Sequence, residues 1–184
     1  MSKTFNIPNT LTLFRILLIP VFVVSLAKGN YNMALGSFTI AAITDALDGF
    51  SARHFNQQTL VGTILDPLAD KLLVVTAFIA LGLLKLIPLW LLAIVITRDA
   101  IIAIGMLLFT MKHIMIELKP SLVSKFTTTF QLLTIVFALA ALVWHLPWPQ
   151  QWVWIITGIL TVLSGTHYTY IGMTYLNEIE SPQR

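Results

Sequence analysis

The sequence predicts an all-α, polytopic membrane protein that forms one domain over residues 1–184, with six transmembrane helices and both termini in the cytoplasm. Charged residues make up only 10% of the chain and hydrophobic residues 57%, which is too little charge to cover a water-facing surface. The apolar residues also gather into stretches long enough to span a bilayer. Finally, Lys and Arg divide unequally between the two sides that six spans would create.

The predicted spans follow one another with only short breaks, which leave no room for a separate soluble domain. The spans are residues 10–27, 31–54, 64–84, 88–111, 122–143 and 151–176. The breaks between them contain the polar residues and prolines typical of turns. They are Lys28–Asn30, Asn56–Thr59, Lys85–Pro88, Glu117–Pro120 and Pro147–Pro149.

Basic residues predict the orientation. Lys28 and Lys85 fall on one side of the membrane, and Arg98 lies inside the fourth span. The remaining eight fall on the side of the termini: Lys3, Arg15, Arg53, Lys71, Lys112, Lys119, Lys125 and Arg184. Because basic residues favour the cytoplasmic side, both termini are expected there. The short chain, read without a transit segment, favours a bacterial inner membrane.

Four aspartates lie in or beside the second and third spans: Asp45, Asp48, Asp66 and Asp70. A carboxylate inside a bilayer costs at least about 2.5 kcal/mol, so accidental packing does not explain four of them. Spacings of three and four residues place each pair on one helix face. The short loop between the spans predicts antiparallel neighbouring helices whose carboxylates face each other. Four like charges need cations, and oxygen ligands favour hard divalent ions such as Mg²⁺, Mn²⁺ or Ca²⁺.

The run D-A-L-D-G-F-S-A-R, followed after eight residues by G-T-I-L-D-P-L-A-D, places these aspartates in register with two glycines, an alanine and an arginine. It resembles the signature of the CDP-alcohol phosphotransferase family at all eight specified positions. The resemblance implies that the four aspartates ligate two metal ions, Mg²⁺ or Mn²⁺. It further implies that Asp70 is the catalytic base and that the protein is a homodimer. The substrates would be CDP-diacylglycerol and an alcohol, with CMP released and no nucleic acid bound.

The same resemblance assigns donor binding to Asp48, Gly49, Ala52, Arg53 and Gly62. These residue types make physical sense, because glycines let a nucleotide approach the backbone and an arginine pairs with phosphate oxygens. The alternative is that the small residues only allow close helix packing.

Near the N-terminus, Asn9, Thr12 and Arg15 are spaced by three and share one side of the first span. We expect them to line the nucleotide pocket. The alternative for Arg15 is anchoring at the membrane interface, with its charged end extended to water.

The fourth span bears on the acceptor alcohol. Phosphatidylglycerophosphate synthases of this family show a second arginine about seven residues after an Arg-Glu pair, which suits a phosphorylated acceptor. Here the pair is Arg98-Asp99 and the later position is near Met106, so no arginine follows in that helix. The Arg98-Asp99 pair and the polar run that extends from Leu118 to Gln131, with Ser124 and Lys125 in it, look more like CMP-forming cardiolipin synthases of this family, whose acceptor is phosphatidylglycerol. Glycerol 3-phosphate remains the alternative acceptor.

Arg98 and Lys125 are candidates for contacting the acceptor phosphate. Asp99 should point about 100° away from Arg98 on a helix, so Arg98 is expected to face another acid or a phosphate. The alternatives are a buried ion pair between helices for Arg98 and an interfacial position for Lys125.

A function of another class is also considered: a cation transporter that uses intramembrane carboxylates as its pathway. Such a protein should spread its carboxylates across the membrane and often shows paired repeats. In this sequence the aspartates gather near one face and no repeat is visible, which favours the transferase.

Overall fold

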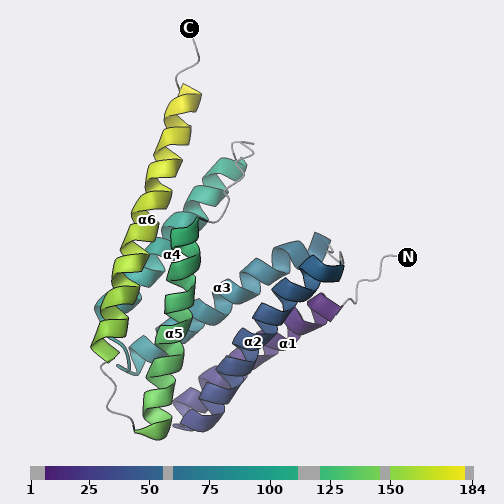
Figure 1. Cartoon of the computed structure of the whole chain (residues 1–184), viewed down its shortest axis with the longest axis vertical. Helices are drawn as coiled ribbons and strands as arrows, with labels where there is room; N and C mark the ends of the chain where they lie inside the picture. Colours follow the sequence, from purple (N-terminus) through teal and green to yellow (C-terminus); the bar gives the residue numbers. More distant parts are fainter. Residues whose placement is uncertain (1–6, 56–59, 112–120, 146–149, 181–184) are drawn as a thin grey trace. The chain divides into compact units, whose positions relative to one another are not determined.

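The computed structural model describes residues 7–55, 60–111, 121–145 and 150–180, and it describes side chains over most of these ranges. Six helices account for the described residues, and no strand occurs among them: α1 (Ile7–Ala27), α2 (Tyr31–Phe55), α3 (Leu60–Leu83), α4 (Leu89–Met111), α5 (Leu122–Trp144) and α6 (Gln150–Glu180). Figure 1 shows these helices along the chain. The predicted all-α class is confirmed, and the predicted helix ends differ from the observed ones by at most four residues.

Local backbone chemistry explains where the first helix stops and the second starts. Gly29 has φ 73°, a left-handed conformation that glycine adopts without strain. Just past the end of α1, the Gly29 and Asn30 amides donate to the Leu26 and Ser25 carbonyls. The Asn30 side-chain oxygen then accepts from the Met33 amide at 3.2 Å, which caps α2. The predicted turn after the first span is therefore confirmed.

Three helices carry stretches long and apolar enough to cross a membrane, judged by length and composition over the described residues. The stretches are Thr10–Ala27, Leu89–Leu108 and Leu122–Trp144. Their outward faces are apolar; Leu17, for example, is 60% exposed. Apolar side chains left exposed over whole helices fit a bilayer as the surrounding solvent. The number of spans, six, and the side of the termini stay predictions.

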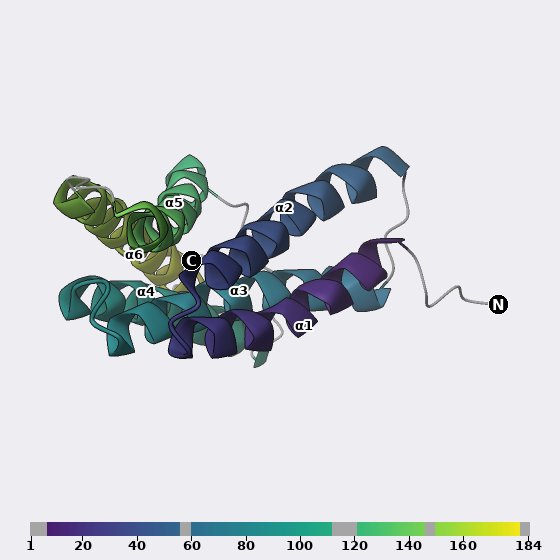
Figure 2. The same ribbon diagram turned by 90° about the horizontal axis from the view of Figure 1, so that it is seen from below.

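The chain divides into two compact units, one with residues Met1–Leu86 and Ile135–Trp148, the other with Ile87–Thr134 and Pro149–Arg184. In the first unit α1 packs against both α2 and α3, as Figures 1 and 2 both show. Phe22 of α1 and Phe38 of α2 are fully buried, with ring centroids 5.6 Å apart. Extensive direct packing of α2 on α3, expected from their short connection, is not found among the described residues, where α1 packs on each of them.

In the second unit α4 and α6 run side by side in the same direction (Figure 1). A Cβ atom added to Gly158 of α6 would lie 2.7 Å from Cζ3 of Trp90 of α4, so the glycine permits this close packing. The first part of α5 joins the same unit through hydroxyl groups. Thr134 and Thr157 are 2.8 Å apart, and the Thr127 hydroxyl lies 3.0 Å from the Leu160 carbonyl. Hydrogen bonds between helices of this kind hold membrane bundles together.

Candidate functional site

Two aspartates of the acidic motif meet a buried arginine inside the first unit. Arg15 projects from α1, Asp45 from α2 and Asp70 from α3. The Oδ1 atom of Asp45 lies 3.0 Å from Nη1 of Arg15, and Oδ1 of Asp70 contacts that same nitrogen. Carboxylates from two different helices thus converge on one positively charged atom.

The burial of this triad is asymmetric. The Arg15 side chain is 0% exposed, whereas those of Asp45 and Asp70 are 38% and 42% exposed. The arginine is therefore enclosed, whereas each carboxylate keeps more than one third of its side-chain surface exposed. The two carboxylates offer hard oxygen ligands of the kind that Mg²⁺ or Mn²⁺ prefers.

For the rest of the predicted acidic site, the structure describes the helix backbone but not the side chains. Asp48, Gly49, Ala52 and Arg53 belong to α2, and Gly62 and Asp66 belong to α3, but only their helices are described. No group of three or more metal-binding side chains occurs among the residues that were described. The four-aspartate metal site therefore stays a prediction, of which the structure describes Asp45 and Asp70.

Of the three residues predicted to line the nucleotide pocket from the first span, the structure describes the side chains of two. Thr12 and Arg15 are both fully buried in α1, whereas the side chain of Asn9 lies outside the described set. The interfacial alternative for Arg15 is wrong, because the guanidinium group is buried against Asp45 and Asp70 instead of extended to water. In the sequence, the three-residue spacing between Thr12 and Arg15 indicates that the two side chains lie on the same side of α1. Lining of the nucleotide pocket by these residues stays a prediction.

Arg98 of α4 sits in a buried network of its own in the second unit. Its Nη1 donates to Oδ1 of Asp99 at 2.8 Å, and its Nη2 donates to the hydroxyls of Ser124 and Ser164 at 2.8 and 2.9 Å. The expectation that Asp99 points away is wrong, since a long guanidinium side chain can fold back toward the next residue. An ion pair does form, but within α4 and not between helices.

Two partners in this network were not predicted as site residues. Ser124 belongs to the polar run that resembles cardiolipin synthases but was given no role, and Ser164 is one of many small polar residues in α6. The ring of Tyr168 adds a third partner, with the Arg98 guanidinium carbon 6.0 Å from its centroid. Lys125, in contrast, is exposed in the first turn of α5, as an interfacial or headgroup-binding lysine would be.

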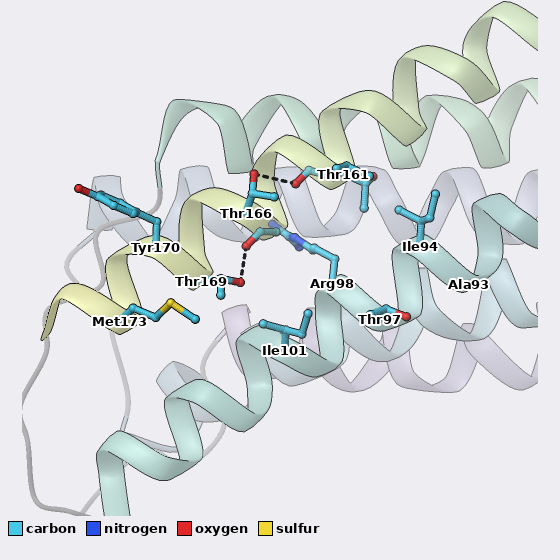
Figure 3. A pocket seen from close by; sticks show the side chains of 12 residues that line it. Ala93, Ile94, Thr97, Arg98, Ile101, Thr161, Thr166, Thr169, Tyr170 and Met173 are labelled. Carbon is cyan, nitrogen blue, oxygen red and sulfur yellow. Dashed lines mark hydrogen bonds between the residues drawn. The ribbon is translucent and has the colours of Figure 1, made fainter. Parts of the chain in front are cut away.

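A pocket of about 550 Å³ lies between α4 and α6, and Figure 3 shows the side chains around it. Its walls are mostly apolar, with Ile94, Ile101 and Met173 among them. Arg98 contributes to the wall, and its Cβ and Cγ lie near the position of a Cβ added at Gly165. The guanidinium group itself bonds to Asp99 and the two serines, so this pocket presents an apolar surface and not a free positive charge.

These features define a helical membrane protein whose motif carboxylates converge on a buried cation. The family model for CDP-alcohol phosphatidyltransferases matches residues 5–163. The chain therefore belongs to the CDP-alcohol phosphatidyltransferase family. The family resemblance drawn from the motif is confirmed.

Individual relatives carry two kinds of name. The chain is 34% identical to a probable cardiolipin synthase (CMP-forming) of Drosophila melanogaster over 89% of its own length and 56% of the relative. It is 33% identical to the human cardiolipin synthase (CMP-forming) over 93% of its length and 63% of the relative. It is also 34% identical to a CDP-diacylglycerol–glycerol-3-phosphate 3-phosphatidyltransferase of Wigglesworthia glossinidia brevipalpis, over 91% of both chains. The chain thus spans less than two thirds of the animal relatives, and nearly all of the bacterial one.

Proposed function

We propose that the protein transfers a phosphatidyl group from CDP-diacylglycerol to an alcohol and releases CMP, in a reaction that depends on divalent metal ions. The observation that carries this proposal is the convergence of Asp45 and Asp70, from different helices, on one cationic nitrogen. Both belong to the family's acidic motif, and the family model covers that motif. Family membership also favours a transferase over a cation transporter.

The metal ions would be held by Asp45, Asp48, Asp66 and Asp70. Bound Mg²⁺ or Mn²⁺ supplies charge neutralisation of the pyrophosphate and orientation of the reacting groups. Gly49, Ala52 and Gly62 leave room for the cytidine diphosphate beside the helices, and Arg53 pairs with its phosphate oxygens. Asn9, on the same side of α1 as the buried Thr12 and Arg15, completes this pocket.

The chemical step requires one base and one leaving group. The acceptor hydroxyl oxygen attacks the phosphorus of the phosphatidyl group, the bond from that phosphorus to the CMP oxygen breaks, and CMP departs with the bonding electrons. Asp70 accepts the hydroxyl proton, a role for which its partly exposed carboxylate is accessible. Phosphoryl transfer of this kind depends mainly on positioning and electrostatics.

Phosphatidylglycerol is the acceptor that we propose, with cardiolipin as the product. Its free glycerol end carries no terminal phosphate, and after Arg98 the helix α4 contains no further arginine. Met106 occupies the position at which a phosphorylated acceptor would favour a second arginine, and its apolar side chain is 53% exposed. Glycerol 3-phosphate is the second candidate, favoured by the bacterial relative named above.

For the phosphate of the acceptor, Lys125 is better placed than Arg98. An exposed lysine at the start of α5 can reach a headgroup phosphate directly. The Arg98 guanidinium donates to Asp99, Ser124 and Ser164, so we assign it the role of holding α4, α5 and α6 together beside that lysine. We further propose that the chain acts as a single-domain homodimer in a bacterial inner membrane, with the site facing the cytoplasm.

In the test, purified protein in detergent micelles receives CDP-diacylglycerol together with either phosphatidylglycerol or glycerol 3-phosphate. Each mixture contains Mg²⁺, Mn²⁺ or EDTA. We expect CMP release and cardiolipin formation with phosphatidylglycerol, and loss of both in EDTA. A product from glycerol 3-phosphate alone would reject the proposed acceptor and keep the transferase. No CMP release with either acceptor would reject the transferase itself.

A further inference from the structure

Arg15 contacts the two motif carboxylates that the proposed metal site would also use. Its Nη1 contacts Oδ1 of Asp45 and Oδ1 of Asp70, and these two oxygens come from helices α2 and α3. A divalent ion held by these two carboxylates would therefore lie close to the guanidinium group, where two positive charges repel each other. The guanidinium and the ion therefore neutralise the same pair of carboxylates.

The packing of α1 keeps Arg15 at this place. The arginine side chain is 0% exposed, and α1 packs along both α2 and α3. Burying a guanidinium group is costly unless it has anionic partners, and the two aspartates provide them. In turn, Arg15 relieves the repulsion between two carboxylates that face each other inside the unit.

We propose that Arg15 is a built-in counter-ion that competes electrostatically with the catalytic divalent ion for Asp45 and Asp70. It stabilises the metal-free site and lowers the affinity for metal, so that ions bind reversibly. This inference rests on the proposed function, because the metal site is part of that proposal. The competition follows from charge alone, since a fixed positive group beside the site reduces what an incoming cation gains.

The experiment measures binding of Mn²⁺ alone, without lipid substrate, to the full chain in detergent micelles by titration calorimetry. Arg15→Gln should bind Mn²⁺ about tenfold more tightly than the wild type, within the usual range of coupling between two groups at one site. Arg15→Lys retains the positive charge and should stay close to the wild type. Arg98→Gln removes another buried arginine, one that pairs with Asp99, and serves as the matched control with unchanged Mn²⁺ affinity.

Thermal unfolding in EDTA gives a second readout. Arg15→Gln should unfold at a lower temperature than the wild type in EDTA and should gain more from added Mn²⁺, because the ion replaces the missing charge. Equal or weaker Mn²⁺ binding by Arg15→Gln would overturn the proposal and show that Arg15 only positions the carboxylates. The proposal would also be overturned if neither the wild type nor Arg15→Gln bound Mn²⁺.

Should Arg15→Gln not fold, infrared spectra of the wild type with isotope-labelled arginine replace it. Addition of Mg²⁺ should shift the guanidinium bands, and the shift should be absent from Arg15→Lys but present in Arg98→Lys. An unchanged wild-type spectrum would contradict the competition. The proposed function is judged separately by metal-dependent CMP release, so a transferase whose Arg15 variant binds metal more weakly refutes this inference alone.

Discussion

At the scale of single residues, charge balance organises the acidic motif. Arg15 has no exposed surface and meets two carboxylates that are each more than one third exposed. Removing one partner of a buried ion pair typically destabilises a protein by about 3–5 kcal/mol, because it leaves an uncompensated charge behind. Substitutions in this triad must therefore be tested for folding as well as for activity.

Asp70→Asn keeps the size of the side chain and removes its ability to accept a proton. We expect kcat to fall by about 10²–10⁴-fold, the usual contribution of a general base. Binding of the CDP-linked donor should persist, because three aspartates of the motif remain. Turnover and equilibrium binding of CDP-diacylglycerol, measured on the same preparation, check both parts. Substantial remaining activity would show that Asp70 is not the base.

Arg53→Ala tests the donor-binding role assigned to the end of the motif in α2. Loss of a charge-assisted bond to phosphate should raise the KM for CDP-diacylglycerol by about tenfold or more, since such bonds contribute about 1.5–3 kcal/mol. The KM for the acceptor should change much less. Steady-state kinetics with each substrate varied in turn makes this comparison, and an unchanged donor KM would reject the role.

At the scale of helices, hydroxyl groups and small residues set the packing of the second unit. The Thr127 hydroxyl of α5 shares its proton between a carbonyl of its own helix and one of α6. The Thr134 hydroxyl can donate to a carbonyl of α5 and accept from the Thr157 hydroxyl of α6. Gly158 of α6 leaves the space that the ring of Trp90 fills. In a bilayer, where apolar surfaces gain little by meeting each other, such contacts decide which helices associate.

Gly158→Ala should destabilise this unit. The added Cβ would lie 2.7 Å from Cζ3 of Trp90, and the rigid indole ring must move as a whole. Overpacking of this kind costs about 1–3 kcal/mol, so the midpoint of thermal unfolding in detergent should fall. Gly105→Ala is the matched control, because nothing lies within 4 Å of its added Cβ. A control variant as unstable as Gly158→Ala would exclude the contact with Trp90 as the cause.

At the scale of the whole molecule, the topology in the membrane can be tested with engineered cysteines, because the chain contains none. Asn32 is exposed in the first turn of α2 and should lie outside the cytoplasm, whereas Gln183 near the C-terminus should lie inside. In intact spheroplasts, an impermeant maleimide should label Asn32→Cys at once. It should label Gln183→Cys only after permeabilisation. Labelling of both positions from the same side would contradict the six-span arrangement.

The positions of all six helices could be read from the linear order of apolar stretches and turn residues. Such features are local: a bilayer requires about 20 apolar residues in succession, and the breaks contain the turn chemistry themselves. The family could also be recognised, because its motif consists of residue types at set spacings. The same spacings single out Asp45 and Asp70 as candidate site residues.

The partners of the two buried arginines depended on the tertiary structure. No spacing could show that Arg15 of α1 would meet carboxylates of both α2 and α3, since those contacts span 30 and 55 residues of sequence. Nor did helical geometry predict the pair of Arg98 with Asp99, because the direction of a long side chain depends on the neighbours around it. Residue order sets where a helix forms and what it carries, whereas long-range packing selects which charges meet.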